Sequence, residues 1–196
     1  MKNGAFAQSL YKQSAVQMEE LDTVRVEQDG RTFAYALAGS VALAAGKTNQ
    51  APVPDSNANN ETLSATQSAA IGATKLTVTF GGAVTADYYK DGYIYATDAA
   101  GEGHMYRVAG HPAGTTDVVV TLKDAIRVAW VASTTIWTAI ANRQAYLIIG
   151  SVPTITARVA GVAPMPITAL YYFWNQVKGP ATCLLSGTVV LGDPVC

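Results

Sequence analysis

The chain has 196 residues, with 13 basic and 14 acidic side chains and a formal net charge of −1. Only 14% of the residues are charged and 49% are hydrophobic, whereas about 25% of residues are charged in a typical soluble domain. This composition excludes a disordered polyelectrolyte and a charge-rich helical bundle. The lysines and arginines are spread along the chain without a run, which argues against nucleic acid as a partner.

The N-terminus and the cysteines indicate the compartment of synthesis. The first nine residues lack the apolar core of a secretion signal, and no run of about 18 apolar residues could span a bilayer. A hairpin turning at Ser186-Gly187 would place Cys183 and Cys196 about 20 Å apart, too far for a disulfide. We therefore expect a soluble protein made inside the cell, with two reduced thiols and no membrane partner.

Residues 1–28 are rich in Gln and poor in large apolar side chains. Phe6, Leu10, Met18 and Leu21 are spaced so that they only loosely fit one face of a helix. We interpret this segment as an extended N-terminal arm that docks on another surface, rather than as part of a core.

Residues 29–196 have the pattern of a β-rich domain, with two subdomains as an alternative. Residues 31–37 alternate polar and apolar side chains, and Gly46 after them predicts a first hairpin. Residues 51–70 contain two prolines and few large apolar side chains, which predicts a loop. The further predicted strands are 75–80, 92–97, 104–109, 117–122, 126–131, 135–140, 145–149, 155–159, 167–177, 181–185 and 188–191.

The spacing of these runs, with β-branched and aromatic residues in alternation, predicts an all-β fold. An antiparallel β-sandwich or barrel-like domain fits this pattern. We expect at most one short helix, near the amino end or around residues 85–90. No exact internal repeat is visible.

The imidazoles of the chain are His104, at the start of a predicted strand, and His111, which precedes Pro112 in a predicted turn. A nucleophilic triad needs a base held against a Ser or Cys, and an orienting acid. Neither histidine lies in a nucleophile elbow or another local catalytic motif. We interpret both as structural, predict no catalytic residue, and expect that the protein is not an enzyme.

Asp98, Glu102 and His104 could converge on a metal ion. Their spacing lacks the alternating oxygen donors and the closing Glu of a calcium loop, and Gly101 and Gly103 are better explained as turn residues with positive φ. No phosphate-binding glycine loop is present. We therefore predict neither a metal nor a cofactor.

Three blocks of sequence carry a resemblance to a known class of protein. They are GRTFAY (30–35) with LAAGK (43–47), DGYIYATD (91–98) with GEGHMYRV (101–108), and YYFWNQVKGPA (171–181). Together with scattered blocks over most of residues 29–195, they resemble virion structural proteins of tailed bacteriophages, and most closely head decoration, or cement, proteins. The long N-terminal arm departs from small proteins of this kind.

The resemblance implies a non-enzymatic β-rich protein on the exterior of the virion capsid. It would bind the lattice of the major capsid protein, often as a homotrimer, and lock neighbouring shell subunits against internal DNA pressure. No catalytic residue is carried over. The low charge of the chain agrees with this, because a closed assembly hides neutral surface.

Two regions are expected to make capsid or subunit contacts: the arm and the aromatic strand near the C-terminus. Their contact residues would be Phe6, Leu10, Tyr11 and Met18 in the arm, and Tyr171, Tyr172, Phe173 and Trp174 in the strand. The strand would divide its alternating side chains between the core and a partner. Deleting residues 1–25 is expected to weaken capsid occupancy and leave the β-rich domain folded.

Three alternatives stay open. A fibre or adhesin-like module would recognise host glycan through exposed Trp and Tyr faces, although core packing also explains Trp130, Trp137 and Trp174. A minor collar or tail component could use the same strand patterns. A virion-associated hydrolase would need a cleft with paired acids or an activated histidine.

Overall fold

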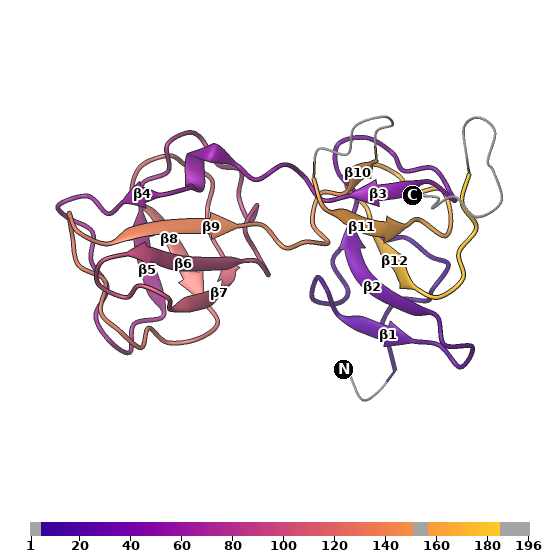
Figure 1. Cartoon of the computed structure of the whole chain (residues 1–196), viewed down its shortest axis with the longest axis horizontal. Helices are drawn as coiled ribbons and strands as arrows, with labels where there is room; N and C mark the ends of the chain where they lie inside the picture. Colours follow the sequence, from indigo (N-terminus) through magenta and orange to yellow (C-terminus); the bar gives the residue numbers. More distant parts are fainter. Residues whose placement is uncertain (1–4, 151–156, 185–196) are drawn as a thin grey trace, which may run out of the picture. The chain divides into compact units, whose positions relative to one another are not determined.

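The computed structural model describes residues 5–150 and 157–184 (Figure 1). Its regular structure is strands apart from one short 3-10 turn, so the predicted all-β, antiparallel fold is confirmed. The chain divides into two compact units, made of Met1–Val53 with Arg143–Cys196 (unit 1) and of Pro54–Asn142 (unit 2). Unit 2 is therefore an insertion within unit 1, a division that differs from the expected boundary at residue 28.

Unit 1 contains one six-stranded sheet in the order β1-β2-β12-β11-β3-β10, with antiparallel pairing between neighbours. Its strands are β1 (Val24–Val26), β2 (Thr32–Leu37), β3 (Thr48–Gln50), β10 (Ile148–Ile149), β11 (Val159–Val162) and β12 (Tyr172–Lys178). The expected first hairpin is wrong, because β2 pairs with β1 and β12 and not with the strand after Gly46. Five of the six residues of β2 are buried. This burial requires a paired strand on each edge of β2 and packed side chains on both of its faces.

The two faces of the unit 1 sheet pack against separate apolar clusters. The first contains Leu10, Leu21, Phe33, Tyr35, Leu37, Ala145 and Trp174. The second contains Ala36, Ala38, Leu43, Leu147, Ala163, Ile167 and Phe173. Because neighbouring residues of a strand point to opposite faces, Phe173 and Trp174 serve different clusters.

The N-terminal segment belongs to this core, so its interpretation as an arm that docks elsewhere is wrong. Phe6 meets the edge of Trp174 with ring centroids 5.0 Å apart, and Leu10 and Leu21 are buried. Ser14 exchanges two backbone hydrogen bonds with Tyr172. The few apolar side chains of this segment are enough to hold it in the core, because they pack directly against the sheet. Deleting residues 1–25 would therefore strip the core of unit 1, and it cannot test a capsid contact separately.

A cluster of buried amides lies beside the apolar clusters of unit 1. Asn175 on β12 and Asn49 on β3 exchange side-chain hydrogen bonds of 2.8 and 3.1 Å. The Asn175 amide nitrogen also lies 2.9 Å from Gln144 Oε1 and 3.1 Å from the Ala160 carbonyl oxygen. This network joins β3, β11, β12 and the chain just after unit 2.

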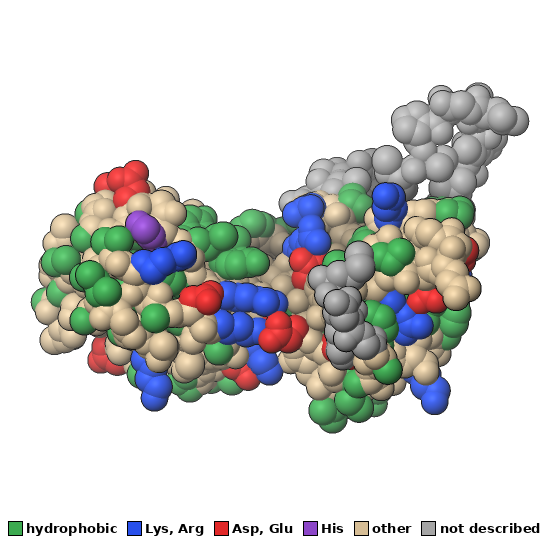
Figure 2. Space-filling model, turned by 90° about the horizontal axis from the view of Figure 1, so that it is seen from below, with side chains coloured by type: hydrophobic (Ala, Val, Ile, Leu, Met, Phe, Trp, Pro, Cys, Tyr) green, Lys and Arg blue, Asp and Glu red, His purple; other side chains and the backbone are tan. Residues whose placement is uncertain are grey.

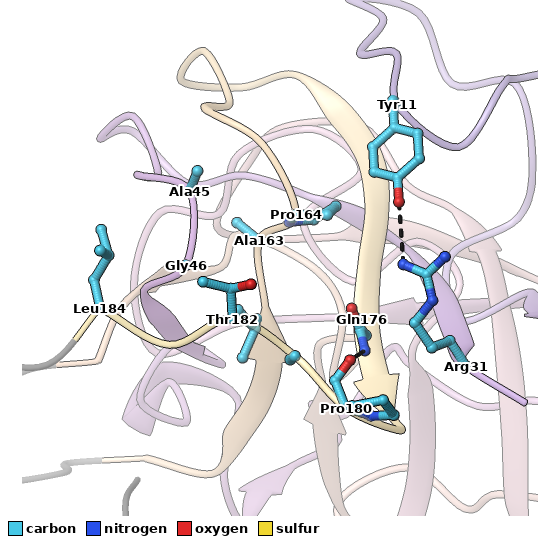
Figure 3. Close-up of a pocket in the computed structure, with 12 residues that line it drawn as sticks. Tyr11, Arg31, Ala45, Gly46, Ala163, Pro164, Gln176, Pro180, Thr182 and Leu184 are labelled. Atoms are coloured by element: carbon cyan, nitrogen blue, oxygen red, sulfur yellow. Dashed lines mark hydrogen bonds between the residues drawn. The ribbon is translucent and has the colours of Figure 1, made fainter. Parts of the chain in front are cut away.

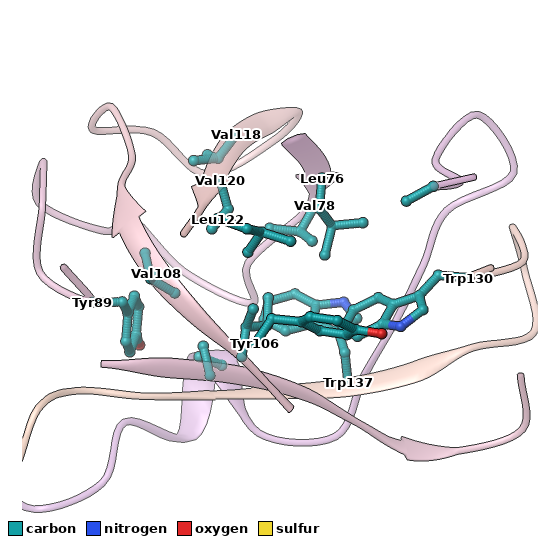
Figure 4. Packing of buried hydrophobic residues seen from close by; sticks show 14 of the residues in the cluster. Leu76, Val78, Tyr89, Tyr106, Val108, Val118, Val120, Leu122, Trp130 and Trp137 are labelled. Atoms are coloured by element: carbon teal, nitrogen blue, oxygen red, sulfur yellow. The ribbon is translucent and has the colours of Figure 1, made fainter. Parts of the chain in front are cut away.

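Unit 2 contains the second six-stranded sheet, in the order β4-β9-β6-β7-β8-β5. Its elements are the turn η1 (Ser56–Ala58) and the strands β4 (Glu61–Thr62), β5 (Lys75–Val78), β6 (Tyr93–Asp98), β7 (Met105–Gly110), β8 (Val118–Leu122) and β9 (Ile136–Ile140). Figure 4 shows the rings of Trp130, Trp137 and Tyr106 packed together beside the aliphatic side chains of β5 and β8. One apolar cluster thus holds the unit together.

Some predicted elements differ from the structure. Residues 126–131 form no strand and contribute only a bridge at Trp130, and residues 51–70 hold η1 and β4. Residues 85–90 form turns rather than a helix, and residues 181–184 are irregular. Cys183 is a free thiol. Cys196, the predicted strand 188–191 and residues 155–156 lie outside the described residues.

Three isolated antiparallel bridges share a geometry that the sequence did not reveal. They join Leu43 to Ile167, Ala69 to Trp130, and Val84 to Gly114. Three residues after each of these six positions the backbone has a positive φ, at Gly46, Gly72, Asp87, Asp117, Ser133 and Leu170. Five of these residues lie within three positions of the start of a strand, and further turn residues separate Asp87 from β6. Bridge, left-handed turn and strand therefore form a repeated element in both units.

The two units also share a plan of strand connections. In unit 1, β2 pairs with β12, and the bridge from Leu43 to Ile167 ties the chain before β3 to the chain before β12. In unit 2, β4 pairs with β9, and the bridge from Ala69 to Trp130 ties the chain before β5 to the chain before β9. In unit 2, β6 and β7 lie in the sequence between β5 and β8. The corresponding place in unit 1 is between β3 and β10, which is where unit 2 is inserted.

Candidate binding surface

The imidazole of His111 is buried and holds a turn of unit 2 together. Its Nε2 accepts a hydrogen bond of 3.1 Å from the Tyr89 backbone N–H, and its Nδ1 lies 2.9 Å from the Pro112 carbonyl oxygen. These partners require the neutral tautomer with the proton on Nδ1. The Asp87 carboxylate accepts a hydrogen bond of 3.0 Å from the His111 backbone N–H. With both nitrogens used, this imidazole is not placed to act as a general base.

We predict that His111→Ala destabilises unit 2 by about 2 to 3 kcal/mol, because two hydrogen bonds and ring packing against Phe80 and Tyr89 are lost. His104→Ala, at a half-exposed position, should change the free energy of unfolding by less than about 0.5 kcal/mol. Urea unfolding of both variants measures the difference. Equal stabilities would contradict the structural role of His111.

The loop between β6 and β7 is a turn, as predicted. Gly101 and Gly103 have φ values of +89° and +78°, and a side chain at Gly101 would meet Trp130 Nε1. Asp98 and Glu102 are exposed. Within residues 5–150 and 157–184, no group of three His, Cys, Asp or Glu side chains is arranged to hold a metal ion.

The predicted contact residues of the N-terminal segment are placed differently from one another. Leu10 is buried and Phe6 is half-buried, so the prediction of a contact surface is wrong for Leu10. Tyr11 and Met18 are exposed by 55% and 49%. The Tyr11 hydroxyl accepts a hydrogen bond of 3.1 Å from Arg31.

The predicted contact residues of β12 and the turn before it lie mostly in the core. Phe173 and Trp174 are fully buried, so neither reaches a partner and the prediction is wrong for both. Tyr172 is half-buried and stacks on Tyr35, with ring centroids 5.9 Å apart. Tyr171 is half-buried against the second apolar cluster of unit 1. The strand divides its alternating side chains between two cores, not between a core and a partner.

Burial also changes the chemistry of two tyrosines. It raises the pKa of Tyr35 to about 12, and the Tyr35 hydroxyl donates to Gln8 Oε1 at 2.8 Å. Burial and the neighbouring Asp55 raise the pKa of Tyr89. Both hydroxyls are therefore neutral structural groups at physiological pH. The three tryptophans are each 1% exposed or less, so the exposed tryptophan faces that a glycan-binding module requires are absent.

Unit 1 has a groove of about 430 Å³ on its surface (Figure 3). Tyr11 and Arg31 lie at one end and Leu184 with Ala45 at the other. The remaining lining residues are Gly46, Val162, Ala163, Pro164, Gln176, Pro180, Ala181 and Thr182. Sequence reasoning missed this groove because its walls come from segments far apart along the chain.

The groove is almost free of charge. Its one ionised side chain, Arg31, is paired with Asp29 at 2.6 Å, and hydrogen bonds from the Arg31 backbone and side chain lower the pKa of Asp29. Among residues 5–150 and 157–184, no carboxylate lines the groove, so the described residues supply no pair of acids for hydrolysis there. Its small apolar side chains and backbone groups suit a neutral surface or segment of another protein.

Several aliphatic side chains that are more than half exposed are not among the predicted contact residues. Val16 is 66% exposed, Val41 60% and Leu170 55% in unit 1, and Ile71 is 69% exposed in unit 2. Sequence analysis missed these positions, because single aliphatic residues in turn segments give no periodic signal. Figure 2 shows one face of the molecule, on which uncharged groups predominate and charged side chains form small clusters.

Comparisons of the chain with protein-family models, with curated proteins and with solved structures found no match. Among the residues that the structure describes, no helix is long and apolar enough to cross a membrane.

Proposed function

We propose that the chain is a structural virion protein, a decoration protein that binds the outside of an assembled tailed-bacteriophage capsid. The resemblance in residues 30–47, 91–108 and 171–181 suggested this class, and the character of the surface supports it. The chain acts by binding and not by catalysis. Its partner is the lattice of the major capsid protein.

The observation that carries the proposal is the exposure of aliphatic side chains on a chain with few charges. Val16, Val41 and Leu170 are each more than half exposed, and only 14% of all residues are charged. With so few charges on the chain, exposed apolar side chains are suited to contact with another protein surface. The buried His111, and a groove to which no described residue contributes a carboxylate, favour a binding role over an enzymatic one.

Binding would stabilise the shell by mass action. A ligand that binds only the assembled lattice shifts the equilibrium away from free subunits, by about 2.7 kcal/mol per site when it is present at 100 times its Kd.

The test uses heads of the phage whose genome encodes this chain, prepared from a strain that lacks the gene. Purified chain is mixed with these heads, the heads are sedimented, and the bound copies are counted against the major capsid protein. We expect hundreds of copies per head and a head that withstands higher temperature. Dissociated capsid subunits serve as the control and should not bind.

Two results would contradict the proposal. About a dozen copies or fewer per particle would indicate a collar or tail position, where rings of few subunits occur. A lack of binding to the heads would remove the decoration role altogether.

A further inference from the structure

A small pocket of unit 1 brings two arginines together. Its volume is about 270 Å³, and it shares no lining residue with the groove described above. We call it the Arg158 pocket. Its lining residues are Arg143, Gln144, Arg158, Val159, Ala160 and Val177. Two guanidinium groups therefore line one pocket together with small apolar side chains.

Hydrogen bonds join the two segments that carry these arginines. The side chain of Gln144, the residue after Arg143, donates a hydrogen bond of 3.2 Å to the carbonyl oxygen of Ala160, two residues after Arg158. Gln144 Oε1 in turn accepts a hydrogen bond of 2.9 Å from the buried Asn175 side chain. The same network that holds β3, β11 and β12 together thus fixes the wall of the pocket.

The two guanidinium groups differ in how they are paired. Arg143 donates from Nε and Nη2 to the two carboxylate oxygens of Asp22, both at 2.8 Å. This bidentate pair fixes the plane of the Arg143 guanidinium group and leaves Nη1 outside it. Arg158 is exposed, and no carboxylate of the described residues pairs with it. Two positive charges and one negative charge leave a net charge of +1 at this place.

The sequence around the pocket supplies no counter-ion for this charge. No aspartate or glutamate occurs from residue 125 to residue 192, the stretch that contains every lining residue of the pocket. The charged side chains of that stretch are Arg127, Arg143, Arg158 and Lys178. The chain as a whole has a net charge of −1, so the positive excess is local. A local positive excess without a counter-ion favours the binding of an anion.

We propose that the Arg158 pocket binds a carboxylate carried on a short aliphatic stem. Guanidinium groups recognise carboxylates through paired N–H donors. A single negative charge matches the net charge of +1, whereas a doubly charged phosphate would leave an excess of negative charge. The apolar side chains of Val159, Ala160 and Val177 would contact the stem. This inference goes beyond the proposed function and does not depend on it.

The test titrates the full chain, labelled with nitrogen-15, with butyrate at constant ionic strength, and follows the backbone amide signals by NMR. The signals of Gln144 and Ala160 should shift saturably. Acetate, which lacks the stem, and phosphate should bind more weakly, and the uncharged butyramide should not bind. The absence of a saturable shift with butyrate would overturn the inference. Equal or tighter binding of phosphate would overturn the assignment to a carboxylate.

Arg158→Gln removes the charge and keeps most of the side chain. It should weaken butyrate binding at least about tenfold, because charged hydrogen bonds are lost. Its Tm should equal that of wild type, since Arg158 is exposed. Arg127→Gln is the matched control, because Arg127 is an exposed arginine of unit 2 that pairs with no described carboxylate. It should bind butyrate as wild type. Wild-type binding by Arg158→Gln, or an equal loss in both variants, contradicts the site.

Two sources offer this chemistry: a free short-chain carboxylic acid, and an aspartate or glutamate side chain of another protein. Binding of Arg158→Gln to the phage heads distinguishes them. Occupancy equal to wild type would assign the site to a free acid, and a loss of occupancy that butyrate also causes in wild type would assign it to an acidic side chain of the capsid. Heads that do not bind the wild-type chain would refute the proposed function, while the butyrate titration would still decide the Arg158 pocket.

Discussion

Replacing Asn175 with aspartate should destabilise unit 1 by about 3 to 5 kcal/mol at neutral pH, the cost of a buried charge without a counter-ion. Asn175 is fully buried, and its amide nitrogen faces the oxygens of Asn49, Gln144 and Ala160. The substitution puts a carboxylate oxygen where a donor stood. Three acceptors then surround a negative charge in a site that excludes water.

The loss caused by Asn175→Asp should depend on pH in a defined direction. Burial among acceptors raises the pKa of the introduced carboxyl in the folded state above its unfolded value of about 3.9. The folded state then binds the proton more tightly, so the lost stability is partly regained as pH falls through the folded pKa. The opposite trend would contradict the buried network.

Hydrogen exchange followed by mass spectrometry measures this effect separately in each unit. Peptides from β2 and β12 should lose protection in Asn175→Asp, while peptides from β6 and β9 keep theirs. Asn60→Asp is the matched control, because Asn60 is exposed and has a φ of 57° that aspartate tolerates. It should leave exchange in both units unchanged.

Replacing Gly92 with alanine should destabilise unit 2 by about 3 kcal/mol or more, at the upper end of the cost of overpacking. A Cβ at Gly92 would lie against the Ile140 carbonyl oxygen, 2.9 Å from the Tyr89 carbonyl oxygen and 3.0 Å from the Asn142 backbone nitrogen. All three are backbone atoms, so relief requires β6 to move away from β9. β6 and β9 are hydrogen-bonded neighbours in the interior of the sheet, so such a movement would disrupt their pairing.

Gly103→Ala separates this clash from the loss of glycine flexibility. Gly103 has a φ of +78° and no atom within 4 Å of a built Cβ. Its substitution should cost only about 1 to 2 kcal/mol, the backbone penalty of a left-handed alanine. Urea unfolding, with Trp130 and Trp137 as reporters inside unit 2, gives both values. A smaller loss for Gly92→Ala than for Gly103→Ala would contradict the assigned close approach.

Local patterns predicted the strands well where one face is solvated. The run at 92–97 alternates half-buried Tyr93 and Tyr95 with buried Ile94 and Ala96, and β6 forms there. The positive φ of Gly101 and Gly103 also followed from their place between two predicted strands. In each case the signal lies within a few neighbouring residues, so long-range packing does not alter it.

Local patterns failed where distant segments decide the outcome. Ile167 and Trp130 have strand-like neighbours but form only single bridges, because a left-handed residue ends the pairing three positions later. Among those turn residues only Gly46 and Gly72 are glycines, so the repeated element is invisible in the sequence. The prediction that Leu10, Phe173 and Trp174 contact a partner failed for the same reason. Their burial depends on segments that are far away along the chain.

The sequence by itself determined that this protein is built from short antiparallel strands, because side-chain alternation and turn residues act over a few positions. It also determined the low charge from which the binding role is proposed. Only the tertiary structure decided that unit 2 is inserted between Val53 and Arg143, and that the N-terminal segment completes the core of unit 1. It alone placed Leu170 outside that core, because burial follows from which distant segments cover a side chain and not from the residue's own apolar character.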